Sequence, residues 1–257
     1  MGLSFFADLM RGVGRGGVLL FRGAIAFPHL LAHHDSRCRF TRQLYVTGIN
    51  SLPVVSVVAI FTGMILALQT GLELQRWNQE EYIGSAVMLS MLREMGPFMS
   101  GLILAACVGS SMAAQLGTMK VNEEISALEM MSIDPVRFLI APRVWALVIM
   151  MPLLSFYTCA LGLMGGAIVG VTQLNVSFEQ YFNVAMRFAE NKDLYVGLLK
   201  AVLFGFVISG IACHQGLGSK EGAVGVGRAT RNAVIGSFLM ILVTGYVVTR
   251  FFYSFSR

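Results

Sequence analysis

Five long runs without Asp, Glu, Lys or Arg constrain this chain more than any other feature of its sequence. They comprise Gln43–Leu72, Met95–Met119, Val144–Phe178, Ala201–Ser219 and Asn232–Thr249. About 20 apolar residues in a helix cross the hydrocarbon core of a bilayer. Charged residues make up 13% of the 257 residues, whereas about 25% is usual in soluble domains. These few charges exclude an ordinary soluble enzyme, a disordered chain and a disulfide scaffold.

We therefore predict an all-α polytopic membrane protein with five transmembrane helices. The span that contains the second run is extended backward through Arg93 and Glu94 to about Ile83. Val144–Phe178 has 35 residues, too few for two comfortable spans, and Pro152 inside it favours one long helix. The predicted membrane domain covers residues 42–257, with spans at about residues 46–72, 83–112, 138–172, 194–217 and 231–253.

The distribution of Lys and Arg predicts the orientation in the membrane. The segment before the first span and the loops after the second and fourth spans contain 12 of these residues, against 5 on the opposite side. Basic residues collect on the cytoplasmic side, so the N-terminus is expected in the cytoplasm and the C-terminus outside. Residues 1–41 mix Arg with apolar residues, which predicts an interfacial amphipathic helix and no cleaved signal peptide.

A second amphipathic helix is predicted in the loop between spans two and three, at about residues 119–131. Asn122 is expected to cap it, with acidic residues in the first turn and apolar residues at three-residue spacing. Asp134-Pro135 predicts a further cap with proline at the first helical position. The helix either transmits motion from a cytoplasmic motor or only lies at the interface. The candidate coupling residues are Lys120, Glu123, Glu124, Ile125, Leu128, Glu129 and Met131.

Two ionisable residues, Arg93 and Glu94, lie inside the second span. A charge at membrane depth costs about 2.5–3.5 kcal/mol on insertion scales, so each is expected to face a partner or a wet cavity. Sequence neighbours point to different faces of a helix, so the two need not pair with each other. They either line or gate a route for lipid headgroups, or lock helices together.

Further charged and aromatic residues lie at the ends of spans. Asp193 and Lys200 open the fourth span seven residues apart, which is two helical turns, so both can face the same way. The alternative for Lys200 is snorkelling to the interface. Arg42 and Tyr45 begin the first span, as interfacial anchors or as ligands.

No chemistry is indicated within the chain itself. There is no nucleophile–base set, so no catalytic residue is assigned, and no metal site is indicated. The sequence contains no G-x-x-x-x-G-K-[ST] motif, so any ATP that drives this protein is hydrolysed, with Mg²⁺, by another chain. The cysteines are far apart and form no CxxC pair: Cys38, Cys107, Cys159 and Cys213.

Four ordered segments are more specific than any of these short patterns. They are Leu92–Pro97 (LREMGP), Ala114–Met131 (AQLGTMKVNEEISALEMM), Asp134–Arg137 (DPVR) and Ala141–Arg143 (APR). They closely resemble the LRELGP, AELGTM-x-VTEQIDALE-x-M, DPIR and PR segments of the MlaE/YrbE family, the permease subunits of MCE-type lipid-transporting ABC systems. The match is dense over about residues 89–145 and looser at Arg42–Tyr45 and Gly225–Thr230.

The resemblance implies a permease subunit of an ATP-driven ABC transporter in the bacterial inner membrane. Such a system moves phospholipid or a related lipid between inner and outer membranes and maintains outer-membrane asymmetry. The implied partners are a cytoplasmic ABC ATPase dimer, a periplasmic MCE-domain protein, a second permease copy and, in some systems, a STAS-domain subunit; nucleic acid is not expected. The alternatives are a non-transporting membrane scaffold, a lipid-modifying membrane enzyme and an ion-driven secondary transporter.

Two departures from the family pattern bear on the dimer. Cys107 stands where the family commonly has Arg, and Gln115 stands where it has the acid of AELG. Either these charges pair in relatives and are lost together here, which avoids a stranded buried charge, or a non-identical permease partner carries them. A homodimer is the favoured expectation.

Overall fold

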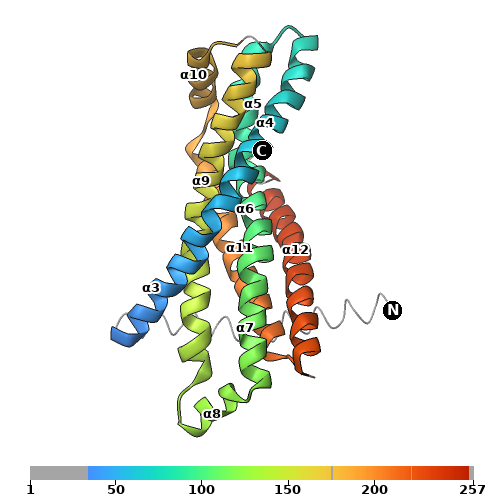
Figure 1. Cartoon of the computed structure of the whole chain (residues 1–257). Coiled ribbons are helices and arrows are strands. Elements are labelled where there is room, and N and C mark those ends of the chain that lie inside the picture. Colours follow the sequence, from blue (N-terminus) through green and yellow to red (C-terminus); the bar gives the residue numbers. More distant parts are fainter. Residues whose placement is uncertain (1–33, 175, 221, 255–257) are drawn as a thin grey trace. The chain divides into compact units, whose positions relative to one another are not determined.

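The computed structural model describes residues 34–174, 176–220 and 222–254, and over these residues it is helical without a strand (Figure 1). Five helical segments are long and apolar enough to cross a membrane: Arg37–Arg76, Glu80–Val121, Val136–Gln173, Asn191–Leu217 and Gly222–Phe252. The predicted all-α fold with five candidate membrane spans is therefore confirmed.

Several of these segments consist of successive helices. The first contains most of α3 (His34–Gly48), a 3₁₀ turn (Ile49–Ser51) and α4 (Leu52–Arg76). The second contains a 3₁₀ turn (Glu80–Tyr82), α5 (Ile83–Ser90), a π-helical segment (Met91–Met95), α6 (Gly96–Leu104), a second π-helical segment (Ala105–Gly109) and α7 (Ser110–Val121). The remaining elements are α8 (Glu124–Met130), a π-helical segment (Val136–Ile140), α9 (Ala141–Gln173), α10 (Phe178–Phe188), α11 (Asn191–Leu217) and α12 (Gly222–Ser254).

The predicted interfacial helix at residues 1–41 lies mostly outside the described residues. Its last part, from His34 onward, belongs to α3, which continues to Gly48. The boundary predicted between residues 41 and 42 thus falls inside a helix. The long third run forms one continuous helix, α9, with Pro152 inside it, as expected.

The described residues divide into two compact units. Unit 1 contains the chain up to Ser51, Leu102–Met150 and Leu203–Tyr246. Unit 2 contains Leu52–Gly101, Met151–Val202 and the chain from Val247. Long helices such as α9 and α11 contribute residues to both units.

Unit 2 is packed through glycines that let helix backbones approach closely. A Cβ atom on Gly63 of α4 would lie 1.9 Å from the carbonyl oxygen of Gly162 in α9. A Cβ on Gly84 of α5 would lie 2.2 Å from the carbonyl oxygen of Tyr181 in α10. Small residues allow this close approach in membrane helices. There, van der Waals contacts between packed helices take the place of the hydrophobic effect as the force that holds them together. The apolar core of the unit forms around Met91, Leu163 and Tyr181.

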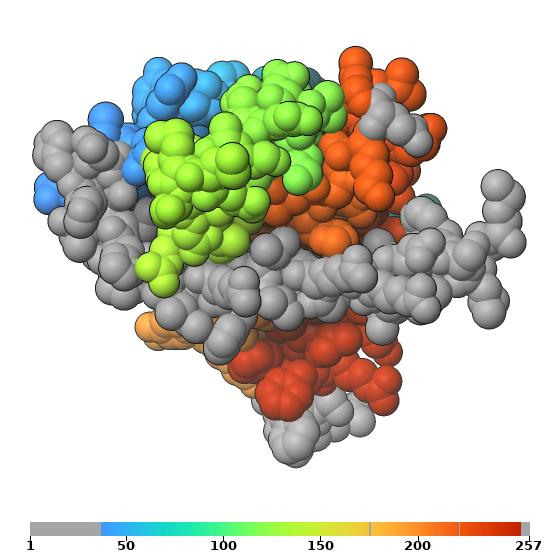
Figure 2. All heavy atoms as spheres, turned by 90° about the horizontal axis from the view of Figure 1, so that it is seen from below, coloured from blue at the N-terminus to red at the C-terminus, as the bar shows by residue number. Residues whose placement is uncertain are grey.

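Unit 1 contains α3, α7, α8 and the start of α9. Figure 2 views one end of it, where the blue atoms of α3 lie beside the green atoms of the segment that includes α8. An observed contact joins these parts, because the Arg39 guanidinium lies 3.8 Å from the centre of the Phe138 ring. Asp134 accepts a hydrogen bond from the N–H of Val136, and the helix begins at Pro135, as predicted.

The predicted cap of the loop helix was wrong. Asn122 ends α7, since its N–H still bonds to the carbonyl of Thr118. Glu123 separates the helices in a left-handed conformation with φ of 60°, which is uncommon for a residue other than glycine. The single helix expected at residues 119–131 is therefore divided into the end of α7 and the short helix α8.

Candidate functional site

Arg93 and Glu94 lie in the π-helical segment Met91–Met95, shortly before Pro97. In an α-helix, the N–H of residue 97 would bond to the carbonyl of Arg93, but proline has no N–H to donate. Single π-helical turns inside α-helices are frequent at functional sites. The backbone is therefore irregular where the two charged side chains leave the span.

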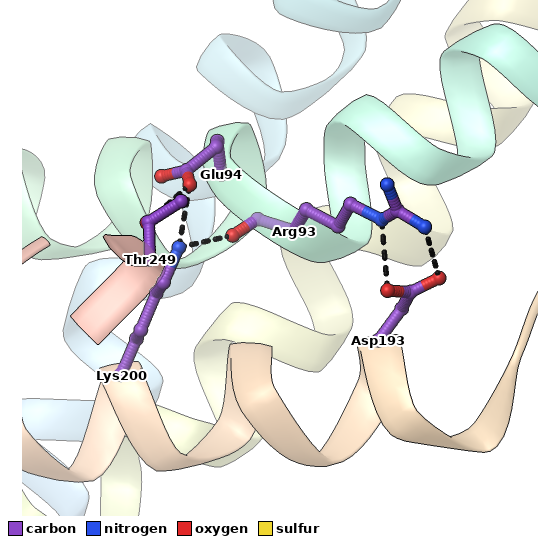
Figure 3. Close-up of polar contacts among 5 residues, drawn as sticks. All are labelled: Arg93, Glu94, Asp193, Lys200 and Thr249. Atoms are coloured by element: carbon purple, nitrogen blue, oxygen red, sulfur yellow. Dashed lines mark hydrogen bonds and ion pairs between the residues drawn. The ribbon is translucent and has the colours of Figure 1, made fainter. Parts of the chain in front are cut away.

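Arg93 forms a two-point ion pair with Asp193 of α11. Its Nε atom lies 2.8 Å from Oδ1 of Asp193 and its Nη2 atom lies 3.0 Å from Oδ2 (Figure 3). This parallel arrangement matches the planar guanidinium to the planar carboxylate and is among the stronger ion-pair geometries. The Asp193 side chain is 1% exposed and that of Arg93 is 39% exposed. The buried acid therefore holds a partly accessible cation in one orientation.

Glu94 points away from Arg93 and meets Lys200 and Thr249 (Figure 3). The Lys200 ammonium donates to Oε1 of Glu94 at 2.6 Å and to the carbonyl oxygen of Arg93 at 2.7 Å. The Thr249 hydroxyl donates to the same Oε1 atom at 2.6 Å. Lys200 is 1% exposed, whereas the Glu94 side chain is 43% exposed. Here the buried cation and the hydroxyl orient a partly accessible acid.

Together these five residues form what we call the charged cluster: Arg93, Glu94, Asp193, Lys200 and Thr249, all in unit 2. Its two acids and two bases balance, which reduces the cost of holding ions in apolar surroundings. Arg93 and Glu94 pair with different residues of α11, as their adjacency on a helix allowed. Asp193 and Lys200 face the same way, as their spacing allowed, and Lys200 is buried rather than extended to the surface of the unit.

Thr249 is the member of the charged cluster that sequence reasoning missed. It ends an apolar run in α12, 155 residues after Glu94. Threonines in such helices usually bond to a carbonyl of their own helix, as Thr158 and Thr230 do here. No local pattern distinguishes Thr249 from them, so only the tertiary contact could identify it.

The other two pathway candidates, Arg42 and Tyr45, lie in α3 of unit 1 and are not part of the charged cluster. Both side chains are exposed. Arg42 lines a cavity in unit 1 together with Arg39 and Arg143. The structure thus gathers four of the six candidates in one cluster.

The candidate coupling residues lie at the end of α7 and along α8. Ile125 is buried and Leu128 is half-buried, but Met131 is exposed, so the predicted stripe does not lie on one covered face. Met130, which the sequence analysis did not select, is 89% exposed. Lys120, Glu123, Glu124 and Glu129 are exposed as well. α8 and the residues beside it therefore present charged side chains and two methionines outward, while Ile125 is the buried residue of α8.

The residue at position 115 has a partner that the sequence did not reveal. The Gln115 side-chain oxygen accepts a hydrogen bond from Nη2 of Arg143 at 3.1 Å. Arg143 is the base at the end of the APR segment. An acid at position 115 would therefore face Arg143, and it does not need residue 107 as its counterion.

Among the described residues, no group of three or more His, Cys, Asp or Glu side chains is arranged to hold a metal ion. The side chains of the charged cluster instead form ion pairs and hydrogen bonds with one another.

Comparison with known proteins decides the family. The sequence model of the family described as Permease MlaE matches residues 40–251. The chain belongs to the MlaE permease family. The Intermembrane phospholipid transport system permease protein MlaE of Haemophilus influenzae is 35% identical to this MlaE-family chain, over 94% of this chain and 92% of its own length. A probable ABC transporter permease protein of Rickettsia typhi is 44% identical, over 81% of this chain and 80% of its own.

A plant protein is also similar. TRIGALACTOSYLDIACYLGLYCEROL 1 of Arabidopsis thaliana, a chloroplastic protein, is 32% identical over 82% of this chain and 61% of its own length. The resemblance found in the LREMGP and AQLGTM segments is thus confirmed. This member of the MlaE family is a multi-pass membrane permease, related to ABC transporter permeases.

Proposed function

We propose that this MlaE-family chain is the transmembrane subunit of an ATP-driven transporter that moves phospholipid between inner and outer membranes. Its activity would maintain the lipid asymmetry of the outer membrane. The observation that carries the proposal is the charged cluster, since apolar spans rarely contain four ionisable groups without a functional reason. The name of the Haemophilus influenzae relative supports phospholipid as the cargo.

The charged cluster suits a lipid headgroup because each of its two ion pairs has one accessible and one buried side chain. Arg93 and Glu94 are the accessible members, and Asp193 and Lys200 are the buried members that orient them. A phospholipid headgroup carries a phosphate and, in zwitterionic lipids, an ammonium group. The oriented cation and anion, which lie side by side, provide a complementary partner for the phosphate and the ammonium group. If each exchanged its ion-pair partner for the headgroup, the path of the lipid through the permease would open or close.

In this proposal α8 couples the permease to ATP hydrolysis. A cytoplasmic ABC ATPase dimer binds ATP and Mg²⁺, closes on them, and moves α8 through contacts with its exposed residues. The complex further contains a second copy of this chain, a periplasmic MCE-domain protein and, in some systems, a STAS-domain subunit. It lies in the bacterial inner membrane, with the N-terminus in the cytoplasm and the C-terminus in the periplasm. We propose no ATP site in this chain.

The first test is purification from native membranes in mild detergent, with identification of co-purifying proteins and mass spectrometry of bound lipid. Co-purification of an ABC ATPase and an MCE protein with stoichiometric phospholipid supports the proposal. A chain that purifies alone and lipid-free contradicts it and favours a scaffold or an enzyme.

A second test measures ATP-dependent transfer of fluorescent phospholipid by the reconstituted complex. We expect Glu94→Gln to reduce transfer at least tenfold while the complex still assembles. Glu73→Gln is the matched control, because Glu73 pairs with Arg76 on an exposed helix surface. Equal transfer by the two variants would assign the charged cluster to helix locking alone.

A further inference from the structure

Unit 1 contains a cavity of about 320 Å³ that shares no residue with the charged cluster. It lies between α3, α7 and the segment that leads into α9. The residues that matter for its chemistry are Arg39, Arg42, Gln43, Gln115, Phe138 and Arg143. Three of these are arginines, and none of the described residues that line the cavity is acidic. Its volume is at the lower end of the range for small-molecule sites.

Arg143 is the most unusual of these residues. It is only 7% exposed, and its Nη2 atom donates to the neutral side-chain oxygen of Gln115. Its Nη1 atom is buried and has no hydrogen-bond partner among the described residues. A buried guanidinium ordinarily has an anionic partner, because removing a charge from water is costly. Within the described parts of unit 1, no carboxylate forms an ion pair with it.

The other two arginines, Arg39 and Arg42, line the same cavity. The Arg39 guanidinium stacks over the Phe138 ring at 3.8 Å, which fixes its plane. Arg42 is exposed, one helical turn further along α3. Gln43 of α3 and Gln115 of α7 also line the cavity and supply neutral polar groups.

We propose that this cavity binds a phosphate group. Guanidinium groups match phosphate oxygens through paired N–H donors, and three of them around one cavity favour a dianion or a phosphodiester over a carboxylate. The phosphate belongs either to a membrane lipid headgroup or to a free phosphate in solution. Because the basic flanks predict that these helix ends lie at the cytoplasmic interface, both sources reach the site.

Gln115 distinguishes this site from the family pattern, which has an acid at this position. An acid at this position, as in the family pattern, would sit against Arg143 and neutralise it. Glutamine keeps the hydrogen bond but leaves the charge of Arg143 for a ligand. The substitution Gln115→Glu therefore supplies an internal anion and is expected to displace phosphate without disturbing the fold.

The experiment measures the thermal unfolding of the purified full-length chain in non-ionic detergent at constant ionic strength. The probes are inorganic phosphate, dihexanoyl phosphatidic acid and, as the uncharged control, dihexanoylglycerol. We expect the unfolding temperature to rise, and to reach a plateau, as a phosphate-bearing probe replaces chloride. Its apparent affinity is expected to fall about tenfold or more in Gln115→Glu and in Arg143→Gln. Arg42→Gln is the second variant at the site, and its exposed position makes it the safer one for folding.

The matched control is Arg137→Gln, since Arg137 is exposed, pairs with Asp134 and does not line the cavity. Stabilisation by both phosphate-bearing probes supports a site open to free phosphate, and stabilisation by the lipid alone supports a headgroup site. The proposal is overturned if no probe stabilises the chain, if dihexanoylglycerol acts equally, or if Gln115→Glu and Arg42→Gln bind as the unmodified chain does. No ATPase or transport is involved, so failure here leaves the proposed transport function untouched.

Discussion

Lys200 and Pro97 act on the same backbone carbonyl. Pro97 lacks the N–H that an α-helix would direct to the Arg93 oxygen, and the Lys200 ammonium donates to that oxygen at 2.7 Å. The same ammonium bonds to Glu94 at 2.6 Å. One buried cation thus satisfies a carbonyl left open by proline and neutralises the neighbouring acid, which explains how an irregular backbone persists inside a membrane span.

The ion pair between Glu94 and Lys200 is expected to respond unequally to loss of either partner. Glu94→Ala leaves a cation that is 1% exposed without its anion and is expected to cost about 3–5 kcal/mol of unfolding free energy. Lys200→Met leaves a partly exposed acid and is expected to cost about 1–2 kcal/mol. Unfolding of the detergent-solubilised chain, followed by circular dichroism, measures both.

The double variant Glu94→Ala/Lys200→Met is the control for this prediction. It removes both charges, so its stability should lie near that of Lys200→Met alone. If Lys200→Met proved the more damaging single change, the burial assigned to the two side chains would be incorrect.

The backbone contact between α4 and α9 makes Gly63 intolerant of any side chain. A Cβ atom at Gly63 would lie 1.9 Å from the Gly162 oxygen, and a backbone atom cannot move aside. We expect Gly63→Ala to destabilise the chain by about 1–3 kcal/mol or more. Thermal unfolding in detergent checks this.

Gly227→Ala is the matched comparison, because no heavy atom of the described residues outside its own helical turn lies within 4 Å of a Cβ placed there. Alanine is the better helix former, so this change should be neutral or stabilising by up to about 1 kcal/mol. A similar response from the two alanine variants would argue against close packing of α4 and α9.

Met130, the exposed methionine of α8, should affect coupling and not folding. Met130→Glu places a charge on a side chain that is 89% exposed, so stability should change by less than about 0.5 kcal/mol. If α8 contacts the ATPase, lipid-stimulated ATP hydrolysis by the complex should fall severalfold. Glu124→Lys should act in the same direction.

Ile125→Ala provides the opposite control on α8. Ile125 is the buried residue of this helix, so its truncation should lower stability by about 2–4 kcal/mol through lost burial and a cavity. Unchanged hydrolysis in Met130→Glu and Glu124→Lys would remove α8 from the coupling mechanism.

Tyr181 in α10, outside the candidate spans, predicts a loss of stability in alkaline solution. Burial raises the pKa of the Tyr181 phenol because the phenolate is poorly solvated there. Below the unfolded pKa of about 10 the phenol is neutral in both states, so its contribution is constant. Above that pH the unfolded chain loses the proton first, and stability falls.

Tyr181→Phe removes this contribution. The hydroxyl is buried and has no hydrogen-bond partner among the described residues, so its loss should be neutral or stabilising at pH 7. The decline in unfolding temperature between pH 9 and pH 11 should be shallower in this variant. A marked loss of stability at pH 7 would instead reveal a hydrogen bond to the hydroxyl.

Much of the architecture followed from local sequence. The uncharged runs predicted five spans, because hydrophobic length is a property of consecutive residues. The seven-residue spacing of Asp193 and Lys200 allowed a shared helix face, and Asp134-Pro135 predicted a helix start, since both depend on helical geometry alone. Adjacency of Arg93 and Glu94 predicted that they leave the helix in different directions.

Local sequence did not determine which side chains meet. Arg93 contacts Asp193 one hundred residues later, Glu94 contacts Thr249, and Gln115 contacts Arg143 across 28 residues. Nor did it reveal the π-helical segments or the break at Asn122. Helical periodicity sets the direction in which a side chain leaves its own helix. Its partner is chosen by how closely the helices pack, here through glycines such as Gly63, and by the need of each buried charge or open carbonyl for a counterpart.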